Sequence, residues 1–337
     1  MKKSITLLLV LTLILGIFVK LGTPDEEEEQ QDTLTVAVVA ASAFGDMAFN
    51  DSAKEGAEQL KEDLGIRTEY YECNLVGIKQ TLMNAAETAD VVVAVGWQCY
   101  EISEVAVEFP DVKFVLMDNP AEGIQDIPNL ISITYAQNEG SFLAGYLAAS
   151  MSKTGVIGAV GAEDTATAKD YLAGYRQGAR YANPDIKIEK VYAADFAAET
   201  AGSDCVQKLA TKGADIIYNI AETTAGSVFE AAQEKGLYVI GTDADQKLAY
   251  PEYDNTILCS VKKEIGQSVY DLVLTYAEDG TWDGAKVHLS DLASGSVTIA
   301  YGGEDSVQLV RDARKAELEE LAGQIISGDI RVKTARN

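Results

Sequence analysis

The chain has 337 residues, 47% of them hydrophobic, which is enough for two domains of about 150 residues each. Its formal net charge of −26 repels phosphate backbones, so we exclude nucleic acid as a partner. A single histidine, His288 in the strand-like run "KVHLSDL", argues against histidine-based catalysis and against zinc sites.

The cysteines are widely spaced and form no CxxC pair. They fit neither a metal site nor a dense disulfide framework. Because free cysteine is usually buried, we expect four small core residues, and one disulfide stays an open alternative. The residues concerned are Cys73, Cys99, Cys205 and Cys259.

The first 32 residues have the composition of a targeting segment. In residues 1–22, Lys2 and Lys3 precede an apolar stretch over 5–19, the layout of a signal peptide but short for a full membrane span of about 20 residues. No small-x-small cleavage site and no cysteine close the stretch, so we expect a signal sequence or an uncleaved N-terminal anchor. The acidic run "TPDEEEEQQD" (23–32) is expected to be a solvated, disordered linker. The folded part then begins near Thr33, outside the cytoplasm, attached to the cell membrane or secreted.

Apolar runs and amphipathic stretches alternate from there on. Strands are predicted at 34–40, 67–72, 91–95, 113–117 and 130–135. The intervening stretch "DSAKEGAEQLKEDLG" has apolar residues at helical spacing. We expect Asn50, Asp51 or Ser52 to cap this helix, Ser52 and Glu55 to form a capping box, and Gly65 to end it. Near-continuous apolar strands separated by helices predict a parallel sheet covered on both faces.

The same pattern then restarts with a strand-like run at 154–161. The run at 185–192 parallels 65–72, the run at 214–220 parallels 89–95, and the run at 238–243 parallels 113–118. We therefore predict an α/β protein with two doubly wound, parallel-sheet lobes.

Ligands of such sheets lie outside the carboxyl ends of the strands. The residues at these ends are mostly aromatic or acidic: Asp46, Phe49, Asn50, Trp97 and Asp118 in the first lobe, and Glu163, Asp164, Tyr192, Phe196, Glu222, Asp243 and Asp245 in the second. This set suits a neutral, flat ligand that carries hydroxyl groups. No GxGxxG or Walker sequence is present.

Several of these residues also have a purely structural interpretation. Phe49 could pack as a hydrophobic staple on the following helix, and Trp97 could pack at a rim. Asp118 and Asp243 could cap the next helices, and Glu222 could be a solvated loop acid. The cluster "DADQ" is oxygen-rich like a calcium loop but lacks its regular spacing and terminal glutamate.

The chain resembles the basic membrane protein (BMP) family, the purine-nucleoside-binding lipoproteins of ABC transporters. The resemblance rests on "GDMAFNDSAKEG", "VAVGW", "FPDVKFVLMD", "EGSFLAGYLAASMSKTGVIGAVG", "AGYRQGARYANPDIKI", "GADIIYNIA" and "YVIGTDADQ", in order over residues 33 to 280. It implies a type I periplasmic-binding-protein fold with a three-crossover hinge near Tyr135, Val261 and Leu292. The implied lobes are 33–135 with 261–292, and 136–260 with 293–330.

The resemblance also implies roles for individual residues. The base-stacking aromatics of the family fall on Phe49 and Phe196, with Tyr192 as the alternate. The polar pair of the "FND" motif falls on Asn50 and Asp51, and the strand-end acids fall on Asp118 and Asp243. The family lysine falls on Lys263, with Lys262 one residue away. Asp46 and Asp164 complete the expected ligand-binding set, together with two departures from the family: Trp97 as a third stacking surface and Glu222 as an acceptor for a purine N–H.

The function implied by the resemblance is capture of a purine nucleoside (adenosine, guanosine or inosine) for delivery to an ABC importer. The expected partners are that nucleoside, the permease and, through the N-terminal segment, the membrane. We expect a monomer without cofactor, metal or enzymatic activity. The family's lipobox cysteine is absent here, which puts lipid attachment in doubt. The alternative is a sugar or other polyol ligand, or a sensor role. A nucleoside hydrolase is disfavoured, because the sequence offers no nucleophile–base pair.

Overall fold

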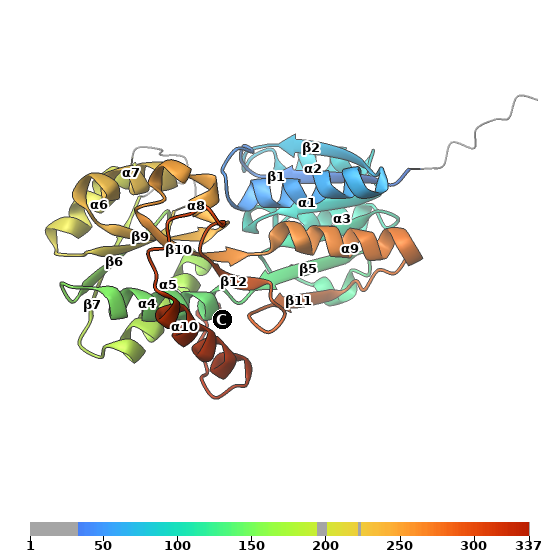
Figure 1. The fold of residues 1–337 in the computed structure, drawn as a ribbon. Helices are drawn as coiled ribbons and strands as arrows, with labels where there is room; N and C mark the ends of the chain where they lie inside the picture. Colours follow the sequence, from blue (N-terminus) through green and yellow to red (C-terminus); the bar gives the residue numbers. More distant parts are fainter. Residues whose placement is uncertain (1–32, 194–200, 222–223, 337) are drawn as a thin grey trace, which may run out of the picture. The chain divides into compact units, whose positions relative to one another are not determined.

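Two six-stranded sheets organise the protein in a computed structural model that describes residues 33–193, 201–221 and 224–336 (Figure 1). The first sheet has the order β11-β5-β4-β3-β1-β2 and the second β12-β10-β9-β8-β6-β7. The strands of the first sheet are β1 (Thr35–Ala40), β2 (Arg67–Glu72), β3 (Val91–Val95), β4 (Lys113–Met117), β5 (Leu130–Tyr135) and β11 (Lys286–Ser290). Those of the second are β6 (Val156–Gly161), β7 (Lys187–Tyr192), β8 (Ile216–Ile220), β9 (Tyr238–Asp243), β10 (Ile257–Lys263) and β12 (Val297–Ala300).

Helices cover both faces of the first sheet, which with them forms the first lobe. Alternate residues of β1 point to opposite faces, so Val36 and Val38 join one buried cluster while Ala37 and Val39 join another. The first cluster includes residues of α1 (Phe49–Leu64) and α9 (Ile265–Asp279), which lie side by side. The second includes residues of α2 (Ile78–Ala86) and α3 (Ile102–Glu108).

The second lobe repeats this arrangement around the second sheet. One face packs against α4 (Gln137–Met151), α5 (Ala166–Ala182) and α10 (Asp312–Ile326), and the other against α6 (Ala201–Thr211) and α7 (Ala225–Lys235). The backbones of α4 and α5 approach so closely that a Cβ atom on Gly178 would lie 1.8 Å from the Phe142 carbonyl oxygen, and one on Gly145 would lie 2.0 Å from that of Tyr175. Short helical turns complete the structure: η1 (Trp97–Cys99), η2 (Ile124–Asp126), α8 (Gln246–Ala249) and η4 (Pro251–Tyr253).

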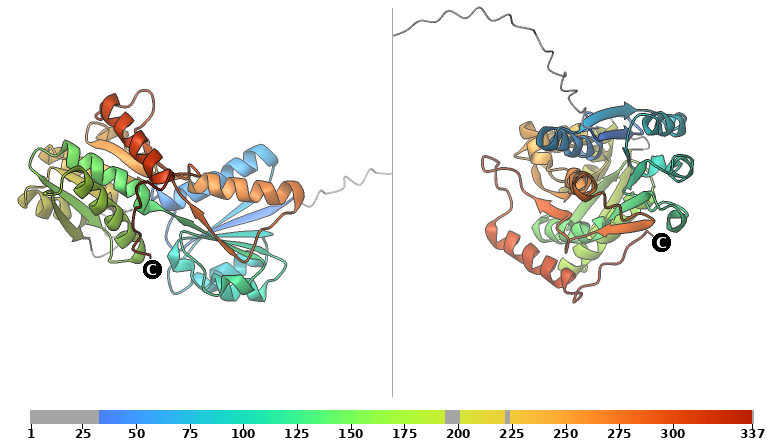
Figure 2. Two further views of the ribbon diagram at one scale, coloured as in Figure 1. Left: turned by 90° about the horizontal axis from the view of Figure 1, so that it is seen from below. Right: turned by 90° about the vertical axis from the view of Figure 1, so that its right-hand side faces the viewer.

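The chain crosses between the two sheets at three places (Figure 2). It leaves the first sheet after β5, returns from β10 into α9, and passes from β11 to β12. The predicted fold is therefore confirmed. One detail differs, because β12 pairs antiparallel with β10 and the second sheet is mixed rather than purely parallel.

Some predictions about segments remain untested. The signal sequence or anchor (1–22) and the acidic linker (23–32) lie outside the described residues, and the predicted lobe limits stay predictions. Among the described residues, no helix is long and apolar enough to cross a membrane. All four cysteines are free; Cys99, Cys205 and Cys259 are buried as expected, whereas Cys73 is half-buried.

Candidate functional site

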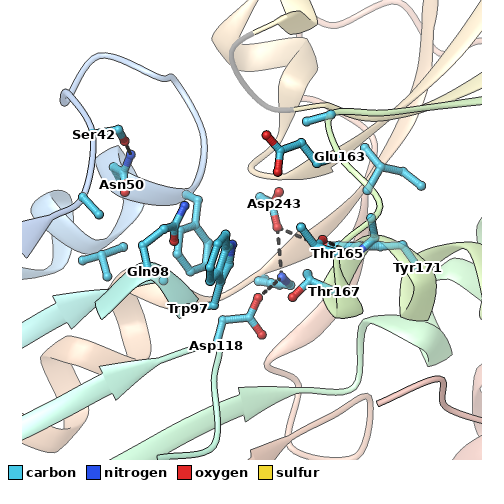
Figure 3. A pocket seen from close by; sticks show the side chains of 18 residues that line it. Ser42, Asn50, Trp97, Gln98, Asp118, Glu163, Thr165, Thr167, Tyr171 and Asp243 are labelled. Atoms are coloured by element: carbon cyan, nitrogen blue, oxygen red, sulfur yellow. Dashed lines mark hydrogen bonds and ion pairs between the residues drawn. The ribbon is translucent and has the colours of Figure 1, made fainter. Parts of the chain in front are cut away.

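A cavity lies between the two lobes, where the carboxyl ends of both sets of parallel strands meet (Figure 3). From the first lobe it is lined by Ser42, Phe49, Asn50, Trp97, Gln98 and Asp118. From the second it is lined by Glu163, Thr165, Thr167, Tyr171, Asp243 and Lys263. The cavity encloses about 50 Å³, whereas sites for drug-sized ligands typically measure about 300–1,000 Å³. A ligand larger than a few atoms does not fit the cavity in this arrangement of the lobes.

The loop after β1 uses two of its acids to hold its own backbone. Buried Asp46 accepts hydrogen bonds from the N–H groups of Ala48, Asn50 and Asp51, and burial, partly offset by these bonds, raises the pKa of its carboxyl group. Asp51 accepts from the N–H groups of Gly45 and Met47. Both acids lie outside the described cavity lining.

The start of α1 corrects the predicted cap. The helix begins at Phe49, and its free N–H groups bond to the Asp46 side chain. Ser52 lies inside the first turn, where its hydroxyl accepts from the N–H of Gly266 in α9. The expected capping box of Ser52 and Glu55 is therefore wrong, because the N-cap is Ala48, four residues before Ser52.

This loop places Phe49 and Asn50 against the cavity. The Phe49 side chain is buried in the core cluster and also lines the cavity, with the Lys263 ammonium 5.5 Å from its ring centroid. Phe49 therefore packs in the core, and its stacking on a ligand stays a prediction. The Asn50 amide donates to Ser42 Oγ at 2.9 Å and to the Ala43 carbonyl.

Two acids occupy equivalent positions in the two lobes. Asp118 follows β4 and Asp243 ends β9, and each is 5% exposed. Both have left-handed backbone conformations, with φ of 58° for Asp118 and 68° for Asp243. Such values are uncommon for residues other than glycine and are frequent at functional sites.

Lys263 links these acids. Its Nζ lies 2.8 Å from Asp118 Oδ2 and 3.2 Å from Asp243 Oδ1. Burial lowers the pKa of Lys263, but the two carboxylates outweigh this effect and the net shift is upward, so the ammonium stays charged. Neighbouring Lys262 pairs with Glu264 instead, at 2.9 Å. Of the two lysines that the resemblance suggested, the structure places Lys263 in the cavity.

Two further groups contact the buried acids, and neither was predicted. The hydroxyl of Tyr171 on α5 donates to Asp243 Oδ1 at 2.7 Å. Arg336 Nη2 donates to Asp118 Oδ1 at 2.7 Å and to Thr167 Oγ1 at 2.9 Å. Burial alone would raise the pKa of Asp118, but Lys263 and Arg336 more than compensate and hold it below its ordinary value.

The remaining walls are mixed in character. Figure 3 shows Trp97 and Gln98 facing Glu163, Thr165 and Thr167 across the cavity. Trp97 is 37% exposed and also lines the cavity. It therefore lies at the rim, where its side chain is accessible to both solvent and a ligand. Exposed Glu163 rather than its neighbour Asp164 lines the cavity.

Other predicted site residues lie elsewhere. Tyr192 donates to Asp164 Oδ1 at 2.7 Å, and Asp164 pairs with Lys169 at 3.2 Å, all at the surface of the second lobe. Phe196 and Glu222 lie outside the described residues. In the described part of the chain, no group of three or more His, Cys, Asp or Glu residues could hold a metal ion; Asp245 of "DADQ" caps α8 and accepts from the Gly302 N–H.

The sequence model of a family described as ABC transporter substrate-binding protein PnrA-like (Bmp) matches residues 33–336. The chain belongs to the Bmp family. Basic membrane protein A1 of Borrelia garinii subsp. bavariensis is 31% identical over 306 residues, which cover 88% of this chain and 87% of the relative. Basic membrane protein A of Borreliella burgdorferi is 30% identical over 306 residues, with 88% and 86% covered. The family consists of solute-binding proteins that act outside the cytoplasm.

Solved structures show the same fold. A solute-binding protein of an ABC transporter system from Aeropyrum pernix K1 superposes with a TM-score of 0.80 at 23% identity, covering 90% of this chain and 94% of that one. A second, from Conexibacter woesei DSM 14684, has a TM-score of 0.74 at 24% identity, with 90% and 99% covered. A periplasmic solute-binding protein from Actinobacillus succinogenes 130z with bound D-allose has a TM-score of 0.60 at 13% identity, with 80% and 97% covered. These proteins have the type I periplasmic-binding fold, and so does this Bmp protein.

Proposed function

We propose that the protein captures a purine nucleoside between its lobes and presents it to an ABC importer. The observation that carries the proposal is the buried row of Asp118, Lys263 and Asp243 beneath an aromatic-lined interlobe cavity. Family membership supports the solute-binding role, and the chemistry of the lining favours a nucleoside.

The aromatic side chains suit a flat base. Phe49 lines the cavity near the end of β1, and Trp97 lines it after β3. Stacking of a base on an aromatic ring contributes about 1–3 kcal/mol in nucleic-acid systems. We expect Phe49 to contact one face of the purine, with Trp97 at the rim as a further contact.

The acids suit a ribose. A carboxylate offers about four acceptor sites; one oxygen of Asp118 is bound by Lys263 and the other by Arg336, so each retains room to accept from a hydroxyl. Asp243 has the same capacity beside Tyr171 and Lys263. Together, Asp118 and Asp243 balance Lys263 and Arg336 in formal charge, which favours an uncharged ligand over a phosphorylated one.

Delivery requires motion of the lobes. Since the cavity of about 50 Å³ is too small for a nucleoside, the lobes must open for entry and close again around the ligand. The three crossovers between the sheets are the natural hinge. In this proposal the closed, loaded form is the one that the permease recognises, and the N-terminal segment keeps the protein at the membrane.

Calorimetry with inosine, adenosine, guanosine and hypoxanthine tests the proposal. We expect Phe49→Ala to weaken nucleoside binding by about 1–3 kcal/mol, or about 5- to 150-fold. Asp243→Asn should weaken binding of nucleosides but affect hypoxanthine far less, because the free base has no ribose hydroxyls. Phe44→Ala is the matched control, since Phe44 packs edge-on against Tyr70 in the same loop region, at 5.9 Å between ring centroids.

The outcomes separate the alternatives. If Phe49→Ala lowers the unfolding free energy while nucleoside affinity is retained, Phe49 is only a packing residue. If the wild-type protein binds a hexose such as D-allose and none of the nucleosides, the purine proposal fails and the polyol alternative replaces it.

A further inference from the structure

The segment after α10 is fastened to the second lobe as a strap, which we define as residues 332–336. The Val332 carbonyl accepts from Asn138 on α4, and the main chain of Lys333 bonds to the Gln177 amide of α5 in both directions. Thr334 Oγ1 and the N–H of Ala335 both donate to Asp170 Oδ1 at 2.7 Å. This series of hydrogen bonds ties the strap to one lobe along its length.

The last residue of the strap reaches the other lobe. The Arg336 guanidinium joins Thr167 of α5 to Asp118, which follows β4 of the first sheet. Only 16% of the Arg336 side chain is exposed, so its ion pair with Asp118 is shielded from solvent and weakly screened by salt.

Arg336 differs from Lys263 in its relation to the hinge. Lys263 ends β10, directly before the crossover into α9, so it lies at a pivot between the lobes. Arg336 is carried by the strap of the second lobe and binds Oδ1 of the same Asp118 carboxylate whose Oδ2 binds Lys263. Its Nε also lies 4.0 Å from Oδ2 of Asp170 in α5, so the second lobe holds the guanidinium. Movement of this lobe away from the first would stretch the bond between Arg336 and Asp118.

The guanidinium also forms part of a wall. A second hollow of about 530 Å³ lies beside the cavity and is lined by Arg336, Ala335, Pro120 and Asn119, together with Trp97, Thr165 and Thr167, which line the cavity too. Arg336 lines this hollow while bonding to two residues of the cavity lining. The guanidinium therefore lies at the border between this hollow and the cavity.

From these contacts we propose that Arg336 is a positioning residue for ligand binding, which acts through Asp118 as a latch between the lobes and slows ligand release. This inference rests on the proposed capture of a ligand between the lobes. It assigns the strap a role in how long the ligand stays, which is distinct from recognition of the ligand.

Dissociation kinetics test the latch. Stopped-flow displacement of a bound nucleoside should show about 10-fold faster dissociation for Arg336→Ala, with association changed less than about 3-fold, because loss of a buried ion-pair partner acts mainly on the off-rate. Arg336→Lys should recover part of the effect, since lysine keeps the charge but not the forked geometry. A chain ending after Thr334 should match Arg336→Ala. Lys333→Ala, which removes an exposed cation of the same strap, is the control.

The results distinguish this inference from the proposed function. If the wild type binds a nucleoside and Arg336→Ala dissociates at the wild-type rate, the latch is overturned, even if the variant melts at a lower temperature. If the wild type binds none of the nucleosides, small-angle scattering of the ligand-free proteins decides. A larger radius of gyration for Arg336→Ala than for both the wild type and Lys333→Ala supports the latch, and equal radii overturn it.

Discussion

Asp118 and Asp243 hold the same place in their respective lobes but have different partners. Each lies at the carboxyl end of the equivalent strand, is 5% exposed and has a positive φ. Asp118 is bound by two cations, Lys263 and Arg336, whereas Asp243 is bound by one cation and the neutral hydroxyl of Tyr171. The repeated fold thus gives a symmetric backbone with an asymmetric distribution of charge.

This difference indicates a division of roles. Asp118 has its charge compensated twice and connects the lobes through both cations, so we assign it mainly to closure. Asp243 has one cationic partner, Lys263, and one neutral partner, Tyr171, so we assign it mainly to the ligand. Four substitutions test this comparison, in order of decreasing expected effect.

Removing the shared cation should have the largest effect. Lys263→Met leaves two buried carboxylates without their common partner, and we expect it to lower the unfolding free energy by about 3–5 kcal/mol at neutral pH. Chemical denaturation measures this loss. Part of the stability should return as the pH falls, because protonation removes the uncompensated charges. The control Lys262→Met breaks a half-exposed pair with Glu264 and should cost less than about 1 kcal/mol; equal losses would contradict the bridging role.

Substitution of the two aspartates should have different effects on stability and on nucleoside affinity. Asp118→Asn takes one carboxylate partner from two cations, Lys263 and Arg336, and should lower the unfolding free energy by about 2–3 kcal/mol. Asp243→Asn takes one carboxylate partner from Lys263 alone and should lower it by about 1–2 kcal/mol. For nucleoside affinity the order should reverse, with the larger loss for Asp243→Asn. Denaturation and calorimetry on both variants measure these effects. Identical profiles for the two variants would refute the division of roles.

The pH dependence of stability tests the ion pair of Asp118 and Lys263 in a second way. Burial raises the pKa of Asp118, but its two cations outweigh burial and the net pKa is lowered. The carboxylate therefore stabilises the fold above its unfolded pKa of about 3.9 and loses this contribution as the pH falls through the lower folded value. In acid, the stability of the wild type should decline more steeply than that of Asp118→Asn, by up to about 1.4 kcal/mol per pH unit. Lys263 has a raised pKa, so its contribution is complete below about 10.4 and is lost only at higher pH.

Tyr171→Phe should have the smallest effect. It removes the hydroxyl that donates to Asp243 at 2.7 Å and should lower the unfolding free energy by about 1 kcal/mol. Burial raises the pKa of Tyr171 well above its ordinary value, so the hydroxyl stays protonated and remains a donor. Tyr175→Phe in the same helix is the matched control, since its buried hydroxyl has no hydrogen-bond partner within the described residues. A larger loss for Tyr175→Phe than for Tyr171→Phe would show that packing, and not the bond to Asp243, sets the effect.

The sheets could be predicted from the sequence because their central strands are buried on both faces. Such strands are continuous apolar runs, and the limits of β3, β4, β5 and β9 agree with the prediction, as do those of the more polar edge strand β2. Asp118 and Asp243 could be placed for the same reason, since the carboxyl ends of parallel strands converge on one edge of each lobe.

Residues outside the strand ends were harder to predict. Tyr171 lies within α5 next to apolar positions, so it is indistinguishable in sequence from core tyrosines such as Tyr175. Arg336 follows the end of α10 by ten residues, and its position depends on hydrogen bonds from α4 and α5 that no local pattern specifies. Thr165 and Thr167 had a usable signal, because they directly follow the strand-end acids of β6. The helix cap was mispredicted because Asp46 acts across a loop, three residues before the helix.

The left-handed backbone of the two acids affects how a mutational scan of this protein should be interpreted. Non-glycine residues without a short polar side chain pay about 1–2 kcal/mol in this conformation, so alanine at Asp118 or Asp243 would add a backbone cost to the loss of the carboxylate. Glycine would do the opposite and relieve strain while removing the charge. Asparagine is also enriched in this conformation, so its effect reports the loss of the carboxylate without an added backbone cost. At these two positions, an alanine scan would overstate the importance of the carboxylates and a glycine scan would understate it.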